Sequence, residues 1–244
     1  MRVGQAVAGC DFEVEYRLGD GVPRREGLAG CSDVLLEDAA AFRGFRFAKG
    51  QRSFAGWWWL ATTGRHVGYE SFCERDHVML LDFDPDVTGV ASQPLCLRWR
   101  DGSGRLRRHV PDFFARLRDG RGVVVDVRPD DRIPDRDAEV FAVTAEACAV
   151  AGWEFRRVGE ADRVLAANVR WLSRYRHPRC ADAAVAETLA GVFAEERMLF
   201  AGAAAAGERL RVLPVLFHLM WRGDLAADLL SGPLGPSAMV RAAR

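Results

Sequence analysis

The chain contains almost no lysine: Lys49 is its single lysine, and every other basic residue is an arginine or a histidine. Coding bias is sufficient to explain this usage. The chain also lacks net charge, with 34 basic and 34 acidic residues, so its overall electrostatics do not indicate nucleic-acid binding. It contains no apolar run of membrane-spanning length, since the longest run near the C-terminus is VLPVLFHLMW.

The six cysteines lack a zinc-binding or disulfide pattern, because they are scattered and none forms a CxxC pair. This spacing favours reduced thiols in a cytosolic protein. The first residues, MRVGQAVAGCDFEVEYR, become polar at once and do not resemble a signal segment. We therefore expect a cytoplasmic protein that does not contact membranes.

The apolar patterns predict an α/β fold, a mixed sheet with helices on its faces. Strands are predicted at residues 12–18, 87–93, 95–101, 106–117, 122–129 and 153–158. Helices are predicted at residues 69–83, 137–151 and 162–175, the last capped by Asp162. The glycine-rich residues 19–30 predict a loop.

The composition predicts three segments. Residues 1–66 form an N-terminal strand and an arginine- and tryptophan-rich segment, residues 67–179 a core, and residues 180–244 a small helical, winged-helix-like module. The three rings of Trp57 to Trp59 cannot all point one way in a strand, so at least one should meet solvent, a partner or a base.

Two aspartates stand inside apolar strands, Asp112 in HVPDFFARL and Asp126 in GVVVDVRP. An unpaired buried carboxylate is expensive to desolvate, which favours a functional explanation. Asp126 and Arg128 share one face because side chains alternate along a strand. With an acid from the preceding helix, this set suits Mg²⁺, or Mn²⁺ in its place, and a substrate phosphate. The arginine would stabilise charge on that phosphate, but its pKa above about 12 excludes it as a general base.

Asp112 and Asp126 can share an ion only if they face the same side of the sheet. A two-residue turn at Gly120-Arg121 would send them to opposite faces. The metal-site hypothesis therefore predicts an odd loop or a bulge within residues 118–122, with a glycine in the left-handed conformation.

The run YESFCERDHVMLLDFDPDVTGVASQP, followed by HVPDF and VVVDVRP, resembles the TnsA endonuclease subunit of heteromeric transposases. That family is part of the PD-(D/E)xK restriction-endonuclease-like nucleases, and the resemblance covers roughly residues 69–176. It implies cleavage of one strand of double-stranded DNA at transposon ends. It also implies two partners, a DDE transposase and an AAA+ ATPase that regulates both subunits, and association with the nucleoid during activity.

The resemblance assigns roles to individual residues. The glutamate of the family's S-x-x-E pattern falls on Glu74, with Glu70 as an outside candidate. The Pro-Asp acid falls on Asp112 and the second metal-binding position on Asp126, while the family's lysine position holds Arg128. The resemblance thus implies metal ligation by the three acids. Gln93-Pro94 matches the family's pattern, and we interpret it as a structural strand entry.

Other polar residues support weaker hypotheses. His77 is interpreted as a polar filler, the DFDPD aspartates as capping and turn residues, and His109 as a candidate for contacting a phosphate or a metal-bound water. The candidate DNA contacts are Arg108, His109, Arg163, Arg170 and Arg174. For the last three, a merely solvated helix face is the alternative.

Three functions remain open at this stage. The first is a Mg²⁺-dependent DNA endonuclease, and the second is a nuclease-like subunit that has lost turnover through Arg128 and only binds DNA or partners. The third, a regulator with a helix-turn-helix in its C-terminal helices, leaves the acids unexplained. We also expect that deleting residues 180–244 leaves a folded, DNA-binding core that no longer responds to its partners.

Overall fold

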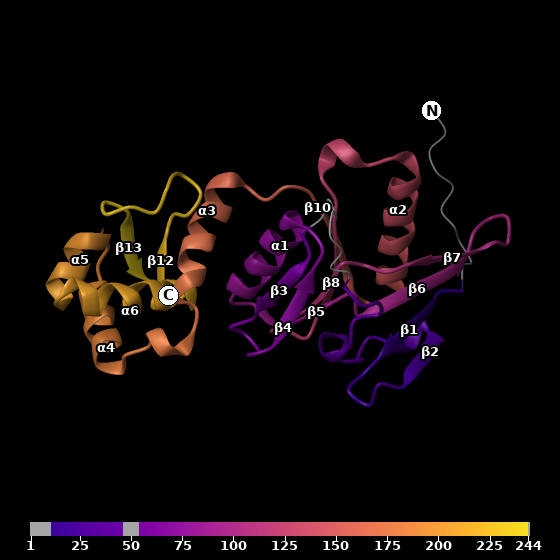
Figure 1. Ribbon diagram of the computed structural model, residues 1–244, viewed down its shortest axis with the longest axis horizontal. Helices are drawn as coiled ribbons and strands as arrows, with labels where there is room; N and C mark the ends of the chain where they lie inside the picture. Colours follow the sequence, from indigo (N-terminus) through magenta and orange to yellow (C-terminus); the bar gives the residue numbers. More distant parts are fainter. Residues whose placement is uncertain (1–10, 46–53, 244) are drawn as a thin grey trace. The chain divides into compact units, whose positions relative to one another are not determined.

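The computed structural model describes residues 11–45 and 54–243, which divide into two compact units (Figure 1). The first unit comprises Met1–Leu81 and Asp86–Glu160, and the second comprises Asp82–Pro85 and Ala161–Arg244. This division differs from the three predicted segments, because the N-terminal segment is part of the first unit and the second unit begins well before residue 180. Lys49 lies outside the described residues.

Among the described residues of the first unit, the strands form two four-stranded sheets and a hairpin. One sheet has the order β2-β1-β6-β7, from Pro23–Gly27, Glu13–Arg17, Leu95–Arg100 and Leu106–His109. The other has the order β10-β9-β8-β5, from Glu154–Val158, Gly122–Val127, Phe113–Leu117 and Val87–Ser92. β10 is parallel to β9 and the other neighbours in this second sheet are antiparallel, so the predicted mixed sheet is confirmed.

Helices α1 (Phe72–Phe83) and α2 (Asp135–Val150) supply apolar side chains to two separate cores. Val78 of α1 belongs to the same buried cluster as Phe113 of β8. Cys148 of α2 belongs to the cluster that contains the next residue of β8, Phe114. Because adjacent strand residues point to opposite faces, the β8 sheet is buried on both faces by helices, as predicted.

Several sequence predictions need correction. The predicted loop at residues 19–30 contains strand β2, which pairs along its length with β1 although all its residues are exposed. The predicted strand at residues 106–117 is divided into β7 and β8, which belong to different sheets. Tyr69 is part of β4 (His66–Tyr69), paired with β3 (Gly56–Trp59), so the predicted helix at residues 69–83 begins only at Phe72.

The tryptophans of β3 differ in exposure, as the sequence predicts. Trp57 is 55% exposed, whereas Trp58 packs against the core cluster that contains Val78. The Trp59 indole nitrogen donates a hydrogen bond to the Gly64 carbonyl at 3.2 Å.

The second unit has the element order of a winged helix. Its helices are α3 (Arg163–Leu172), α4 (Ala183–Val192), α5 (Leu199–Ala206) and α6 (Arg209–Trp221). Strands β11 (Arg197–Met198), β12 (Leu225–Ala227) and β13 (Met239–Ala242) form a sheet in the order β11-β13-β12. From α4 onward the chain runs helix, strand, helix, helix, strand, strand, which agrees with the predicted winged-helix-like module (Figure 1).

Helix α3 explains why the second unit begins earlier than predicted. The Asp162 carboxylate caps α3 by accepting hydrogen bonds from the backbone nitrogens of Val164 and Leu165, both at 2.9 Å. Beyond the helix end, the Tyr175 ring lies 4.9 Å from the Phe217 ring of α6. Within α3 itself, the Trp171 ring lies 6.0 Å from the same Phe217 ring, so α3 packs against α6 inside the second unit.

No helix in the described part of the chain is long and apolar enough to span a bilayer. The cysteines at positions 31, 73, 96, 148 and 180, the five that fall within the described residues, are all free thiols.

Candidate active site

Asp112 immediately precedes β8, and Asp126 lies in β9, the strand that pairs with β8 in this hairpin. Phe113 pairs with Val125 in this register, so extending it by one residue aligns the two aspartates. At the other end, the Leu117 nitrogen donates to the Arg121 carbonyl at 2.9 Å, which leaves an odd loop of three residues, 118–120. Gly120 in this loop has φ of 89°. The predicted odd loop with a left-handed glycine is therefore confirmed.

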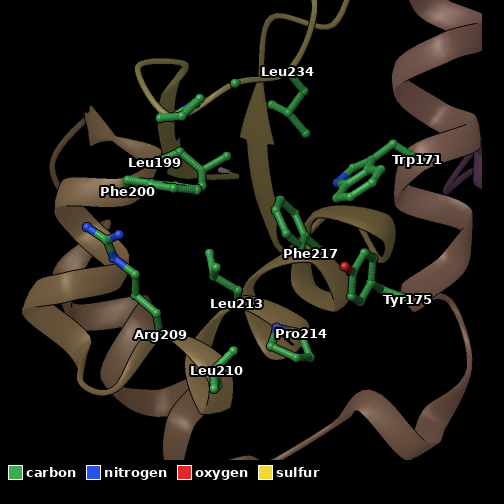
Figure 2. Close-up of a pocket in the computed structure, with 12 residues that line it drawn as sticks. Trp171, Tyr175, Leu199, Phe200, Arg209, Leu210, Leu213, Pro214, Phe217 and Leu234 are labelled. Atoms are coloured by element: carbon green, nitrogen blue, oxygen red, sulfur yellow. The ribbon is translucent and has the colours of Figure 1, made fainter.

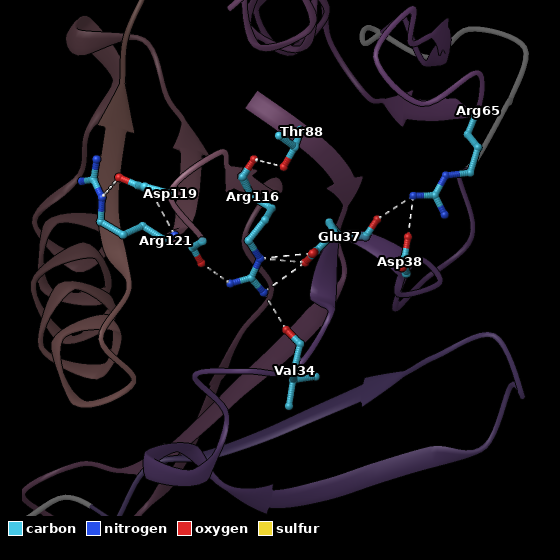
Figure 3. Close-up of polar contacts among 9 residues, drawn as sticks. Val34, Glu37, Asp38, Arg65, Thr88, Arg116, Asp119 and Arg121 are labelled. Carbon is cyan, nitrogen blue, oxygen red and sulfur yellow. Dashed lines mark hydrogen bonds and ion pairs between the residues drawn. The ribbon is translucent and has the colours of Figure 1, made fainter. Parts of the chain in front are cut away.

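Arg116 holds this turn in place (Figure 3). Its guanidinium donates to the Gly120 carbonyl at 2.9 Å and to the Val34 carbonyl at 2.7 Å. It also pairs with the Glu37 carboxylate at 3.0 Å, and both side chains are close to 90% buried. Because the turn sets the register, this arginine indirectly fixes the alignment of the two aspartates.

The Asp112 carboxyl lies in a region of negative charge. One of its oxygens accepts a hydrogen bond from the Val127 backbone nitrogen at 2.7 Å. Burial raises the pKa of Asp112 well above its usual value, and the negative charges of Asp126 and Glu74 raise it further. The Val127 hydrogen bond and the Arg128 charge lower this pKa but do not outweigh those effects. A bound cation would relieve this repulsion.

Asp126 is 3% exposed, and its carboxylate lies 2.8 Å from the His109 Nε2 atom. The His109 ring lies edge-on to the Phe141 ring of α2, with 6.5 Å between ring centres. Burial, followed by the negative charge of Asp126, raises the pKa of the nearby Cys148 thiol to about 12. That thiol therefore stays protonated and is not a nucleophile at neutral pH.

Glu74 is engaged at the start of α1. Its carboxylate accepts hydrogen bonds from the Glu70 backbone nitrogen at 2.7 Å and from the Ser71 hydroxyl at 3.0 Å. In return, the Glu74 nitrogen donates to the Ser71 hydroxyl at 3.1 Å. This arrangement is a variant of the capping box in which the glutamate accepts from the backbone nitrogen of Glu70 instead of that of Ser71, so the S-x-x-E pattern has a structural role whatever else it does. Burial raises the pKa of Glu74, and the Glu70 carboxylate pairs with Arg43 at 2.7 Å.

Arg128 is half-exposed and pairs with Asp137 near the start of α2 at 3.2 Å. Its charge lowers the pKa of Asp112, so the guanidinium is close enough to act on the acid cluster. An exposed arginine beside buried carboxylates suits contact with an incoming phosphate.

Gln93 and His77 each have a defined contact with a backbone carbonyl. The Gln93 nitrogen donates to the Asp112 carbonyl at 2.8 Å. The His77 Nε2 atom lies 2.7 Å from the Gly159 carbonyl, which agrees with a structural role for this histidine.

Asp112 and Asp126 are the two carboxylates that could hold a magnesium ion. Within the described residues, no three His, Cys, Asp or Glu side chains are grouped so that they could hold a metal. Mg²⁺ is usually bound by one or two carboxylates together with waters and substrate phosphates. Asp112 and Asp126 meet that requirement by chemistry and alignment, whereas Glu74 would first have to leave its cap.

The candidate DNA-contacting arginines lie in separate units. Arg108 is exposed on β7 in the first unit. Arg163, Arg170 and Arg174 are exposed in the second unit, and the Arg174 guanidinium lies 5.1 Å from the centre of the Trp171 ring.

The sheet, the helices on its faces and the paired acids define a restriction-endonuclease-like α/β unit. Residues 84–160 match the family described as TnsA-like endonuclease N terminal. The matched stretch includes Asp112, Asp126 and Arg128 but not Glu74, and it covers less than half of the chain. Over this stretch the predicted resemblance to TnsA is confirmed. A search of curated proteins found no match.

The sequence analysis missed the contact between His109 and Asp126 and the conformation of Gln93. The position of the histidine directly before Val-Pro-Asp indicates that it lies near the site, but a side-chain contact between two strands has no sequence signal. The left-handed conformation of Gln93 has no sequence signal, because a residue that precedes a proline is expected to be extended.

Proposed function

We propose that this protein is the metal-dependent DNA endonuclease subunit of a heteromeric transposase and cuts one strand at transposon ends. The position of Asp112 and Asp126 one residue beyond the Phe113–Val125 pair, where the negative charge of Asp126 raises the pKa of Asp112, is the observation that carries this proposal. The match of residues 84–160 to the TnsA-like endonuclease family supports the same reaction class.

Asp112 and Asp126 would hold Mg²⁺, or Mn²⁺ in its place, and Glu74 would join them if its cap opened. When bound, the ion would supply a polarised phosphoryl oxygen and an activated water. Asp112 would keep its carboxylate directed by the Val127 hydrogen bond. His109 would orient the Asp126 carboxylate through their 2.8 Å contact.

Arg128 would bind the scissile phosphate and stabilise the charge that develops on it. It cannot accept a proton at neutral pH, so the attacking water would lose its proton to another group. The ion pair with Asp137 would hold the guanidinium near the cluster until DNA arrives.

The test uses purified full-length chain, alone and mixed with its DDE transposase, on a plasmid carrying the element ends. We expect nicking in Mg²⁺ but not in EDTA, and its loss in Asp112→Ala and Asp126→Ala with DNA binding retained. Glu74→Ala should lose nearly as much, and Glu70→Ala much less. Full cleavage by the Asp112→Ala, Asp126→Ala double variant would refute the proposal.

The second unit is proposed to dock a partner, the regulatory ATPase or the DDE transposase. It contains an apolar pocket of about 300 Å³ whose lining includes Trp171, Tyr175, Phe200, Leu210 and Phe217 (Figure 2). Leu210 is 84% exposed, and the Arg209 guanidinium lies 5.1 Å from the centre of the Phe200 ring. An apolar side chain flanked by acidic residues would suit this combination.

Point substitution tests this docking better than truncation. Deleting residues 180–244 removes α4 to α6 and leaves α3 without α6, the helix it packs on, so the expected folded core would carry an exposed apolar face. Leu210→Glu should weaken partner binding by at least about 10-fold, as expected for a buried anchor. The matched control is Leu230→Glu, because Leu230 is also exposed and lies outside the pocket lining. Equal affinity of the two variants would contradict the assignment.

A catalytically impaired subunit that binds DNA or partner proteins is the alternative. Two observations favour it: the Glu74 carboxylate already caps α1, and His109 already contacts Asp126. In that case the purified complex would bind element ends without nicking them in Mg²⁺ or Mn²⁺. Double-stranded DNA would remain the ligand, with Arg108, His109, Arg163, Arg170 and Arg174 as contacts in either case. A cytoplasmic location, with nucleoid association during activity, is part of both proposals.

A further inference from the structure

Gln93 has an unusual backbone conformation for its residue type. Among the described residues it is the one non-glycine with positive φ, at 49°. Glycine adopts this left-handed conformation without strain, and asparagine and aspartate tolerate it better than glutamine does. A glutamine here therefore costs stability that glycine would not.

The Gln93 side chain adds a second penalty. It is 2% exposed, and its carboxamide oxygen is buried without a hydrogen-bond partner. A buried acceptor without a donor is destabilising, and such groups in native proteins are uncommon. Glycine would remove this penalty as well, so the backbone alone does not explain why a glutamine is present.

Gln93 sits where the chain passes between the two sheets, next to Asp112. Ser92 pairs with Phe113 in one sheet, and Leu97 pairs with His109 in the other. Between these two pairs the segment that contains Gln93 advances by five residues, from Ser92 to Leu97, whereas the opposite segment advances by four, from Phe113 to His109. The segment with Gln93 therefore has one extra residue, as in a β-bulge. The Gln93 nitrogen donates to the Asp112 carbonyl at 2.8 Å, and its carbonyl accepts from the Phe42 nitrogen at 2.7 Å.

We propose that Gln93 is a positioning residue for the metal site, and that its carboxamide oxygen accepts a hydrogen bond from a water bound to the ion at Asp112 and Asp126. The inference rests on the proposed endonuclease function. Mg²⁺ keeps several of its waters when bound to proteins, and each of these waters is a hydrogen-bond donor. Partners of this kind, one shell beyond the ligands, orient the ligands and tune metal affinity.

Two substitutions separate the side chain from the backbone. Gln93→Met keeps the length and the backbone demand but removes the acceptor, whereas Gln93→Gly removes the acceptor and also relieves the backbone. Gln93→Asn keeps a carboxamide and tolerates the left-handed conformation, so it tests partial rescue. Thermal denaturation without metal should find the Met and Gly variants at least as stable as the wild type.

The measurement is Mn²⁺ binding to the full chain by calorimetry without DNA, followed by the Mg²⁺ dependence of nicking. We expect the Met and Gly variants to bind Mn²⁺ about 10–100-fold more weakly, with Asn between them and the wild type. In nicking, the Mg²⁺ concentration for half-maximal rate should rise more than the maximal rate falls.

Each outcome bears on a different claim. If the Met or the Gly variant binds Mn²⁺ with wild-type affinity, the Gln93 carboxamide does not act on the metal site, and the inference is overturned. The endonuclease proposal would still stand. A wild-type chain that binds no Mn²⁺ and nicks no DNA would overturn both. A loss of affinity in Gly but not in Met would assign the effect to the backbone and also contradict the inference.

Discussion

Replacing Asp112 by Asn should stabilise the protein while abolishing cleavage. The carboxylate is surrounded by the negative charges of Asp126 and Glu74, and burial adds to their effect on its pKa. Asparagine has nearly the same shape and can still accept the hydrogen bond from the Val127 nitrogen. The substitution therefore removes repulsion and desolvation but keeps the local contact.

The expected gain can be worked from the register. Residues directly opposite each other in an antiparallel pair have Cβ atoms about 5 Å apart, so the two carboxylates lie at a comparable or slightly larger separation. At roughly 6–8 Å and an effective dielectric constant of about 20, two unit charges repel by roughly 2–3 kcal/mol. A neutral acceptor makes a weaker hydrogen bond than a carboxylate, by about 1 kcal/mol. The net stabilisation should be about 1–2 kcal/mol, or roughly 2–8 °C in Tm.

The difference should depend on pH in a defined direction. Because the pKa of Asp112 is raised in the folded protein, the folded state holds this proton more tightly than the unfolded state. The contribution of Asp112 to the unfolding free energy of the wild type is therefore fully present in acid, and it is lost as pH rises through the raised pKa. The advantage of Asp112→Asn should therefore be small near pH 4 and largest at pH 8.

Denaturation with urea at both pH values, together with hydrogen exchange of β8 and β9 peptides, measures the effect in the first unit. The matched control is Asp119→Asn, because Asp119 is exposed in the same hairpin loop and its pKa is lowered by contact with Arg121. We expect that control to be neutral or slightly destabilising. Mg²⁺ at 100 times its Kd should stabilise the wild type by about 2.7 kcal/mol and the Asp112 variant much less. A variant less stable than the wild type at pH 8 would refute the reasoning.

Substitutions at Arg128, Arg116 and His77 test other parts of the first unit. Arg128→Lys should retain most nicking activity, whereas Arg128→Ala should lose on the order of 10²–10³ in rate; equal loss in both would indicate that the planar fork positions the phosphate. Arg116→Met should destabilise the first unit by about 3–5 kcal/mol in urea denaturation, since it leaves the Glu37 charge buried without a partner, and Arg116→Met with Glu37→Leu should recover much of that loss. Burial lowers the pKa of His77 below its usual 6.5, so the stability that the neutral ring contributes to the folded state should be lost as pH falls below about 6.5. His77→Gln should flatten that part of the curve of unfolding free energy against pH, and an unchanged curve would contradict this assignment.

The alignment of the acids could be predicted because it follows from counting. Side chains alternate along strands, so Asp112 and Asp126 can face one way only if the intervening loop is odd. The three-residue loop with its left-handed Gly120 meets that requirement. The helices with clear apolar periodicity, and the Asp162 cap, were predictable for the same reason, since each depends on neighbouring residues alone.

What the sequence did not predict depends on contacts between distant segments. Strand β2 consists of PRREG, which has no apolar alternation, and its pairing with β1 gives it its structure. The boundary between the units was predicted at a change of composition near His177-Pro178, but α3 packs with α6 and belongs to the second unit. The division of residues 106–117 into two strands falls at Pro111, a local signal against a continuous strand, and coincides with the extra residue near Gln93 on the neighbouring strand, which the sequence pattern does not indicate.

Three unfavourable features meet at one junction of the first unit: opposed carboxylates, a left-handed glutamine and a buried acceptor without a donor. Single substitutions, Asn at position 112 and Gly at position 93, would relieve all three, so stability does not account for them. A hydrated divalent cation would satisfy the carboxylates and the acceptor together, because its charge neutralises the first and its waters donate to the second. DNA binding alone explains neither, since a phosphate would be repelled by the same acids. The impaired-subunit alternative therefore has to explain why the negative cluster is intact, whereas the endonuclease proposal has to explain only how His109 and the Glu74 cap adjust when the ion binds.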